Sequence, residues 1–421
     1  MSGTNSRQVS WSRSWDFMFA TAGWSIGLGN IWRFPYLCYQ YGGGAFLIPY
    51  IFFGFVFALP CLMLEASLGQ MVRKNLIDTW RSKVPVFTGI AYANMVMSFL
   101  FVIHYATLLV WIVKYFGASF STILPWISCK NTWNDERCVD FTIQNKSELF
   151  SLNQLNGTRG ESAAEQYWKL NVLKISSGIN EVGSLQLDLM AYSALVWLLI
   201  YLSTFKGIKF SAKVSYITAT LPAILIVVMV ILGLTLDGSM AGISHYLRPD
   251  ISKLADFEGG PYVFELFNQS SSVAWNFFII CGCELVAVAW FYGAKKHCQL
   301  IRRMIGPTRT ENVIIFFWKY FTLAWCLALA AYSIVFHKAL TYGNYVYPSW
   351  AQAFAHTLSF SSFVWIPGYA IYLLLTSKKT KAELLGRGSQ CSNNDDEKEN
   401  DEVDEAQIEL QCTKLVESSV A

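Results

Sequence analysis

Ala22-Gly-Trp-Ser-Ile-Gly-Leu-Gly-Asn-Ile-Trp-Arg-Phe-Pro35 lies inside the first long apolar run of the chain, at about residues 17–39. The run is long enough for a helix to cross a bilayer, because roughly 20 residues at 1.5 Å each span the hydrocarbon core. Its centre, however, carries residues that weaken a helix in lipid, namely Gly23, Gly27, Gly29, Asn30 and Arg33. Irregular backbone at membrane depth is tolerated where it faces protein or a water-filled cavity, and there its free carbonyl and N–H groups bind ions. The stretch therefore predicts a broken span that binds an ion and a solute, although a small-residue packing face would account for the glycines alone.

The composition is that of a membrane protein. Hydrophobic residues make up 54% of the 421 residues, charged residues make up 14%, and the mean hydropathy is +0.35. A soluble domain of this size is more polar. No basic patch with interleaved aromatic residues is present in the sequence, so we expect no nucleic-acid partner. The first sixteen residues are polar, and we expect no cleavable signal peptide.

The apolar runs predict an all-α integral membrane protein with about eight transmembrane helices. A cytoplasmic arm of residues 1–14 precedes a transmembrane domain of residues 15–377, and a disordered acidic cytoplasmic tail of residues 378–421 follows. The expected spans are residues 17–39, 45–70, 88–116, 187–205, 214–236, 271–293, 312–336 and 350–376.

Two independent signals predict the orientation in the membrane. The loops on one side are rich in Lys and Arg, as cytoplasmic loops are. On the other side, the long loop at residues 117–186 carries two closely spaced cysteines and two glycosylation sequons, at Cys129, Cys138, Asn145 and Asn156. We therefore expect an extracellular loop with one disulfide, both termini in the cytoplasm, and a multi-pass location in the plasma membrane.

Several motifs resemble the neurotransmitter:sodium symporter family, itself a well-known example of inverted-repeat transporters with broken helices. The motifs are Gly27-Leu-Gly-Asn-Ile-Trp-Arg-Phe-Pro-Tyr36, Gly42-Gly-Gly-Ala-Phe-Leu-Ile-Pro-Tyr50, Leu64-Glu-x-x-Leu-Gly-Gln70 and Trp290-Phe-Tyr-Gly293. Towards the carboxyl end, Leu340-Thr-Tyr-Gly-Asn-Tyr-Val-Tyr-Pro348 and Ile366-Pro-Gly-Tyr369 are most similar to the GABA transporter branch. The resemblance covers about residues 11–378 and implies a sodium- and chloride-dependent symporter with a five-plus-five inverted-repeat fold.

The resemblance implies that two Na⁺ ions bind at the broken span. In the family, backbone carbonyls at the positions of Gly23, Ser25 and Ile26 and the side chain at the position of Asn30 help to coordinate them.

The resemblance also implies where an amino-acid-type substrate binds. Gly27 stands where monoamine transporters carry Asp, so the carboxylate of the substrate itself would complete the first sodium shell. N–H groups near Leu28 and Gly29 would hold that carboxylate, and Tyr105 corresponds to the family's substrate-binding tyrosine.

Tyr50 corresponds to a Cl⁻ ligand of the family, and Arg33 to the arginine that closes the outer gate. Asn268 stands where the family usually has the acidic partner of that arginine, so the gate would be a neutral hydrogen bond here.

The largest departure from the family is a missing stretch. The family has twelve spans, but nothing in this chain resembles its helices six to nine, and the join falls near Asp256. The second broken helix is therefore absent, and with it most of the remaining ligands for both Na⁺ ions, for Cl⁻ and for the substrate. The chain is therefore predicted to be a truncated form of the symporter fold that is deficient in solute transport.

Three functions remain open from the sequence. The chain could be a symporter for GABA or a related amino acid, a non-transporting truncated isoform that forms oligomers with full-length relatives and modulates them, or the product of an incomplete gene model. Retention in the endoplasmic reticulum is an alternative to the plasma-membrane location. We expect no enzyme, because no set of nucleophile, base and orienting group and no metal-spaced cluster is evident in the sequence. The expected partners are a small amino-acid-type substrate and the lipid bilayer.

Overall fold

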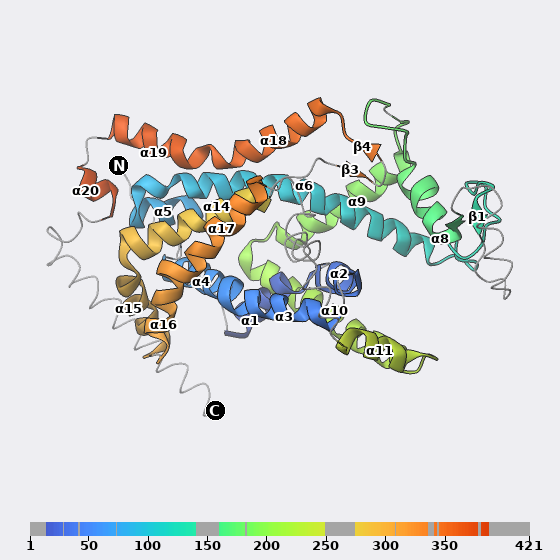
Figure 1. Cartoon of the computed structure of the whole chain (residues 1–421), viewed down its shortest axis with the longest axis horizontal. Coiled ribbons are helices and arrows are strands. Elements are labelled where there is room, and N and C mark those ends of the chain that lie inside the picture. Colours follow the sequence, from blue (N-terminus) through green and yellow to red (C-terminus); the bar gives the residue numbers. More distant parts are fainter. Residues whose placement is uncertain are drawn as a thin grey trace.

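The described residues fold mostly into helices, which form an elongated bundle (Figure 1). The structure is a computed structural model and describes residues 14–27, 29–40, 43–72, 74–139, 160–181, 183–248, 274–307, 309–335, 341–342, 345–377 and 380–386. The predicted all-α membrane fold is confirmed.

Six helical segments within the described residues are long and apolar enough to cross a membrane. They are Gly44–Val72, Pro85–Ala118, Leu187–Thr204, Lys213–Leu234, Trp275–Ile305 and Glu311–Val335. Each overlaps one of the ranges expected from the sequence. The first expected span, residues 17–39, is divided into three short helical pieces: α1 (Ser14–Ser25), the π-helix η1 (Gly29–Arg33) and α2 (Phe34–Gln40).

The last expected span is bent. Helices α18 (Ser349–Phe363) and α19 (Trp365–Thr376) meet at 42°, and together they count as one further candidate span. Pro367 stands in the first turn of α19, where its ring and its missing N–H prevent a continuous helix through Val364. Both helices run along α6 (Gly89–Ala118), as Figure 1 shows.

Three of the spans contain π-helical segments. One is α3 (Gly44–Phe53), η2 (Gly54–Ala58) and α4 (Leu59–Val72); the next is α14 (Ala274–Val286), η5 (Ala287–Gly293) and α15 (Ala294–Ile305); the third is α16 (Glu311–Phe316), η6 (Phe317–Phe321) and α17 (Thr322–Val335). By contrast, α9 (Leu187–Thr204) and α10 (Ile208–Leu234) are continuous helices.

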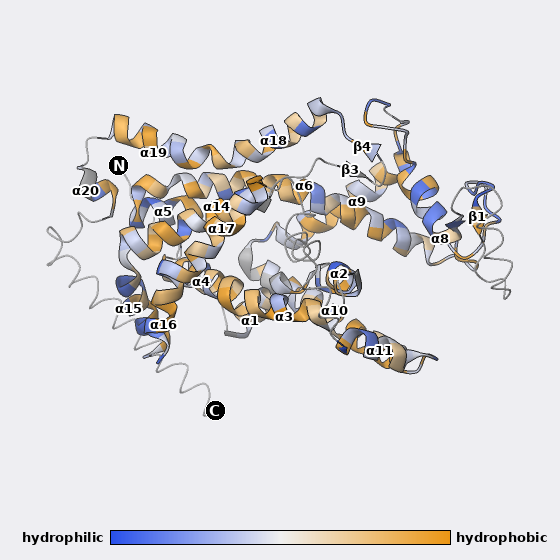
Figure 2. Cartoon of the chain, in the orientation of Figure 1, coloured by the Kyte–Doolittle hydropathy of each residue, from blue (hydrophilic) through white to orange (hydrophobic). Residues whose placement is uncertain are grey.

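The main core lies where α4, α14 and α17 meet the amino-terminal part of α6. Its largest fully buried side chains include Trp318, Phe278 and Leu285. The indole N–H of Trp318 donates to the Pro60 carbonyl at 2.8 Å, which satisfies a polar group inside this core. Most other apolar side chains face outward, and Figure 2 shows that apolar residues dominate the helices in the middle of the bundle. A soluble protein does not expose so much apolar surface, whereas a membrane protein presents it to lipid.

Small polar elements lie at the ends of the bundle. One end carries the parallel strands β1 (Cys138–Val139) and β2 (Glu161–Ser162), followed by α8 (Ala163–Gln166) and the π-helix η4 (Tyr167–Leu173). The remaining short elements are α5 (Leu76–Lys83), η3 (Pro85–Phe87), α11 (Ser239–Leu247), the antiparallel strands β3 (Thr341–Tyr342) and β4 (Tyr345–Val346), and α20 (Lys381–Leu384).

Candidate functional site

The first span is broken at the predicted position. The last regular bond of α1 runs from the Ile26 N–H to the Ala22 carbonyl at 2.8 Å, and the chain resumes with the Asn30 N–H donating to the Gly27 carbonyl at 3.1 Å. Between these bonds the backbone leaves the helical path. Leu28 lies outside the described residues. The break thus interrupts the α-helical hydrogen-bond pattern at Gly27, and irregular backbone in a membrane protein can bind ligands.

Tyr105 on α6 reaches this break. Its hydroxyl lies 3.3 Å from the position that a Cβ atom on Gly27 would occupy. The ring of Tyr105 stacks on Phe101 one turn earlier, with 5.5 Å between ring centroids. The structure therefore brings together two residues that the family resemblance assigns to the substrate site, although 78 positions separate them in the sequence.

Helix α10 supports the amino-terminal half of the broken span. A Cβ atom on Gly23 would lie 3.6 Å from the Cβ of Ala219 and 3.8 Å from that of Ser215, so the two helices pack closely at this point. Near the start of α1, the Tyr216 hydroxyl donates to the Asp16 carboxylate at 2.6 Å. No motif indicated these contacts, because they join residues about 200 positions apart through tertiary packing alone.

The other side of the break is open in the described part of the chain. Ser25, Gly29 and Asn30 are exposed, and no heavy atom of another element lies within 4 Å of a Cβ atom placed on Gly29. The Ser25 hydroxyl donates back to the Thr21 carbonyl at 2.8 Å and so stays within α1. The predicted sodium ligands Gly23, Ser25, Ile26 and Asn30 therefore lie along one segment. Helix α10 packs against Gly23, whereas Ser25 and Asn30 are exposed in the described part of the chain.

The carboxyl-terminal half of the broken span packs on α3. The Phe34 and Tyr50 rings lie 4.7 Å apart between centroids, and the Tyr246 hydroxyl donates to the Pro35 carbonyl at 2.9 Å. Tyr50, the predicted chloride ligand, is 46% exposed. Arg33 is half-buried at the end of η1. Its expected gate partner, Asn268, lies outside the described residues.

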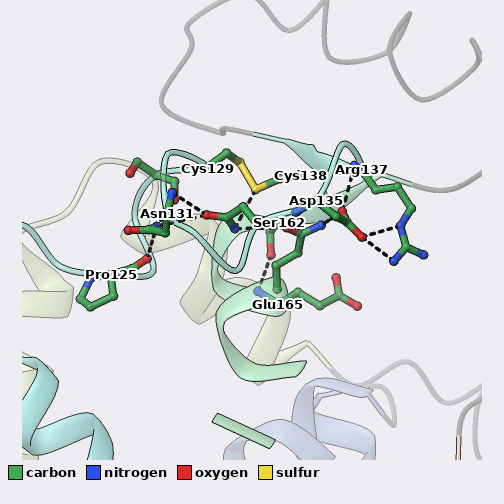
Figure 3. Close-up of a disulfide and its surroundings, with 11 residues drawn as sticks. Pro125, Cys129, Asn131, Asp135, Arg137, Cys138, Ser162 and Glu165 are labelled. Carbon is green, nitrogen blue, oxygen red and sulfur yellow. Dashed lines mark hydrogen bonds and ion pairs between the residues drawn. A yellow bond between two sulfur atoms is a disulfide. The ribbon is translucent and has the colours of Figure 1, made fainter. Parts of the chain in front are cut away.

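The segment between α6 and α9, which contains β1, β2, α8 and η4, is called the polar module. In it a disulfide joins Cys129 to Cys138, with their Cα atoms 5.7 Å apart (Figure 3). Inside the loop that it closes, the Asn131 side chain donates to the carbonyls of Pro125 and Ser128 at 3.0 and 2.8 Å. The predicted glycosylation sites Asn145 and Asn156 lie outside the described residues.

Asp135 connects this loop to α8. Its carboxylate accepts hydrogen bonds from the Arg137 guanidinium, at 2.6 and 2.9 Å, and from the buried Gln166 amide. These hydrogen bonds hold the pKa of Asp135 below its usual value, and the bonds from the Arg137 guanidinium have the largest effect. The module is attached to α6 by Lys114, whose ammonium donates to the Asn171 carbonyl of η4 at 3.0 Å. The same ammonium contacts the Asp188 carboxylate of α9 at 2.7 Å.

A broken first helix in a multi-pass helical protein, with an aromatic hydroxyl at the break, is an arrangement found in membrane transporters with discontinuous helices. The sequence pattern of the Sodium:neurotransmitter symporter family matches residues 8–258 and 257–377. These two matches cover most of the chain, which therefore belongs to this family. It is a multi-pass membrane protein related to transporters rather than to enzymes.

The chain is similar to the sodium- and chloride-dependent GABA transporter 2 of Rattus norvegicus, with 29% identity over 544 aligned residues that cover 91% of this chain and 89% of the relative. It is 44% identical over 255 residues to the sodium- and chloride-dependent taurine transporter of Canis lupus familiaris, covering 60% of this chain and 41% of that protein. The creatine transporter of Torpedo marmorata is 40% identical over 254 residues, with the same two shares.

These comparisons locate the missing stretch. The alignment with the rat transporter spans 544 residues, which is more than the 421 residues of this chain, so it includes residues that this chain lacks. The family pattern matches in two segments that meet at residues 257–258. The chain is thus an internally shortened member of the family, and the predicted join near Asp256 coincides with the meeting point of the two segments.

Proposed function

We propose that this chain is a shortened sodium- and chloride-dependent symporter of the GABA class that does not carry out coupled transport by itself. The observation that carries this proposal is the broken first helix, which keeps one wall of a solute site while its exposed face, at Ser25, Gly29 and Asn30, has no second wall among the described residues.

The retained wall favours a small solute with a carboxylate. Gly27 leaves space beside the Tyr105 hydroxyl, which can donate a hydrogen bond to a carboxylate oxygen. The N–H groups freed near Leu28 and Gly29 would add to this anionic subsite. The names of the relatives include carriers of GABA, taurine and creatine, which are all small zwitterions. We assign this chain to that substrate class.

The residues on this side of the site supply too few ligands for the ions that drive coupled transport. Na⁺ would be coordinated by the carbonyls of Gly23, Ser25 and Ile26 and by the side chain of Asn30, and Cl⁻ by Tyr50. Two Na⁺ ions cannot complete their coordination from one short segment. Each backbone group left without a partner in lipid costs roughly 1–3 kcal/mol or more. A partner that covers this face would therefore stabilise the chain, and a full-length relative with intact helices six to nine fits this need.

This arrangement favours a non-transporting subunit that associates with full-length relatives, with both termini in the cytoplasm and residues 117–186 outside. Association in the endoplasmic reticulum would retain the partner there, and association at the plasma membrane would change its uptake. Autonomous transport remains the second candidate function, because every residue assigned to the first broken helix is retained.

Co-expression tests the proposal. An epitope-tagged form of this chain should co-purify with a full-length GABA transporter in mild detergent and lower its surface level or uptake. Gly29→Trp, on the open face, should reduce both effects. Gly233→Trp is the matched control: Gly233 lies on α10, no heavy atom of another element lies within 4 Å of its Cβ position, and this variant should leave both effects unchanged. Absence of co-purification from membranes that contain both proteins would contradict the proposal.

A further inference from the structure

Two cysteines from distant parts of the chain meet inside the main core. Cys61 lies on α4 and Cys281 on α14, and their sulfur atoms are 3.2 Å apart although 220 residues separate them in the sequence. Both side chains are buried, and both thiols are free. One cysteine belongs to each of the two segments that match the family pattern.

The surroundings of the pair are apolar and contain a third thiol. Phe57 and Phe278 pack edge to face beside the pair, with ring centroids 5.8 Å apart. Cys326 of α17 is fully buried in the same core cluster. The described residues contain no group of His, Cys, Asp and Glu that could hold a metal ion, so the cluster is not a metal site. Charged thiol reagents cannot enter this core, whereas small uncharged oxidants that dissolve in the bilayer can.

We propose that Cys61 and Cys281 form an oxidation site that an uncharged two-electron oxidant converts into a disulfide. Disulfide sulfurs lie about 2.05 Å apart, so the two atoms need to approach by only about 1.2 Å. A diazene oxidant gives the balanced reaction. One thiol adds across the N=N bond and its proton moves to nitrogen; the second thiol then attacks the bound sulfur, the S–S bond forms, and the hydrazine leaves with both protons. A lipid hydroperoxide would give the same disulfide together with an alcohol and water.

The disulfide would connect the two halves of the shortened chain. Residues before the join would be linked covalently to residues after it, at the point where α4 packs on α14. Because such a bond restricts the unfolded chain, the oxidised protein should also resist heat better than the reduced protein.

A cleavable form of the full chain tests this proposal. A site for a specific protease is inserted within residues 250–270, and the purified protein in detergent is treated with diamide, cleaved, and separated by denaturing gel electrophoresis without reductant. The two fragments should migrate together after oxidation and separate when dithiothreitol is added. The Cys129–Cys138 disulfide lies within one fragment and cannot link the two.

Matched variants identify the linked pair. Cys61→Ala and Cys281→Ala should each abolish the linked band, while Cys283→Ala, two positions along the same helix, and Cys326→Ala should retain it. Mass spectrometry of the oxidised unmodified protein should identify the Cys61–Cys281 peptide pair, which removes any dependence on how the variants fold. Fragments that separate after oxidation of a monodisperse sample, or a linked band that persists in Cys61→Ala, would overturn the proposal.

Discussion

The Tyr105 hydroxyl lies 3.3 Å from the position of a Cβ atom on Gly27, which places α6 directly against the break in the first span. This contact explains why Gly at position 27 does more than interrupt a helix. It leaves the space beside the hydroxyl that a substrate carboxylate would occupy, and any larger side chain would take that space.

A larger residue at Gly27 should therefore destabilise the protein. Gly27→Leu would force the Tyr105 side chain or the break to move, at a cost of about 1–3 kcal/mol. Gly29→Leu is the matched control, because no heavy atom of another element lies within 4 Å of its Cβ position. Thermal melting in detergent, followed by size-exclusion chromatography, should show a lower melting temperature for Gly27→Leu only. An equal or larger loss in Gly29→Leu would contradict the contact.

The packing of α6 on α19 gives a second stability prediction. A Cβ atom on Gly89 would overlap the Trp365 carbonyl oxygen and lie 2.7 Å from the Ile366 Cα, so Gly89→Ala must separate the two helices. We expect a loss of more than about 1 kcal/mol. Gly233→Ala on α10 meets nothing within 4 Å and should be neutral or slightly stabilising, since Ala favours helix. Equal melting temperatures for the two variants would contradict this packing.

The polar module should respond to acid through Asp135. Because its folded pKa is lowered, chiefly by hydrogen bonding to Arg137, the unfolded module binds this proton at a higher pH than the folded module does. The interaction therefore contributes stability above the unfolded pKa of about 3.9 and loses it as the pH falls through the lower folded value. The melting temperature of Asp135→Asn should be below that of the unmodified protein at pH 6, and the gap should close towards pH 3. A gap that is constant across this range would contradict this role.

The orientation predicts glycosylation at Asn145 and Asn156. Peptide N-glycosidase should increase the gel mobility of the protein made in mammalian cells, and the double variant Asn145→Gln with Asn156→Gln should migrate like the treated protein. Unchanged mobility of protein that has reached the cell surface would place residues 117–186 on the cytoplasmic side instead.

The sequence was sufficient to predict the break and most of the helices. Gly23, Gly27 and Gly29 beside two polar residues mark a helix that lipid cannot hold, and long apolar runs mark spans whatever their neighbours are. Both features depend on residues that are close together in the sequence.

Features that depend on tertiary packing could not be predicted in this way. The Ser67 hydroxyl and the His297 imidazole, 230 residues apart, lie 2.8 Å from each other inside the core, and neither residue stands in a motif that indicates the other. The π-helical turns at Gly54–Ala58 and Ala287–Gly293 likewise have no local signature. The bend before α19 is different, because Pro367 followed by Gly368 was a visible signal for it.

Uptake by the chain alone tests the central claim most directly. Cells that express only this chain, with its surface level measured by biotinylation, are compared with untransfected cells and with cells that express a full-length GABA transporter, in sodium chloride and in choline chloride. We predict no sodium-dependent uptake of labelled GABA above that of untransfected cells. Sodium-dependent uptake that disappears in Asn30→Ala or Tyr105→Phe would contradict the account, because it would show that one wall of the site is enough for coupled transport.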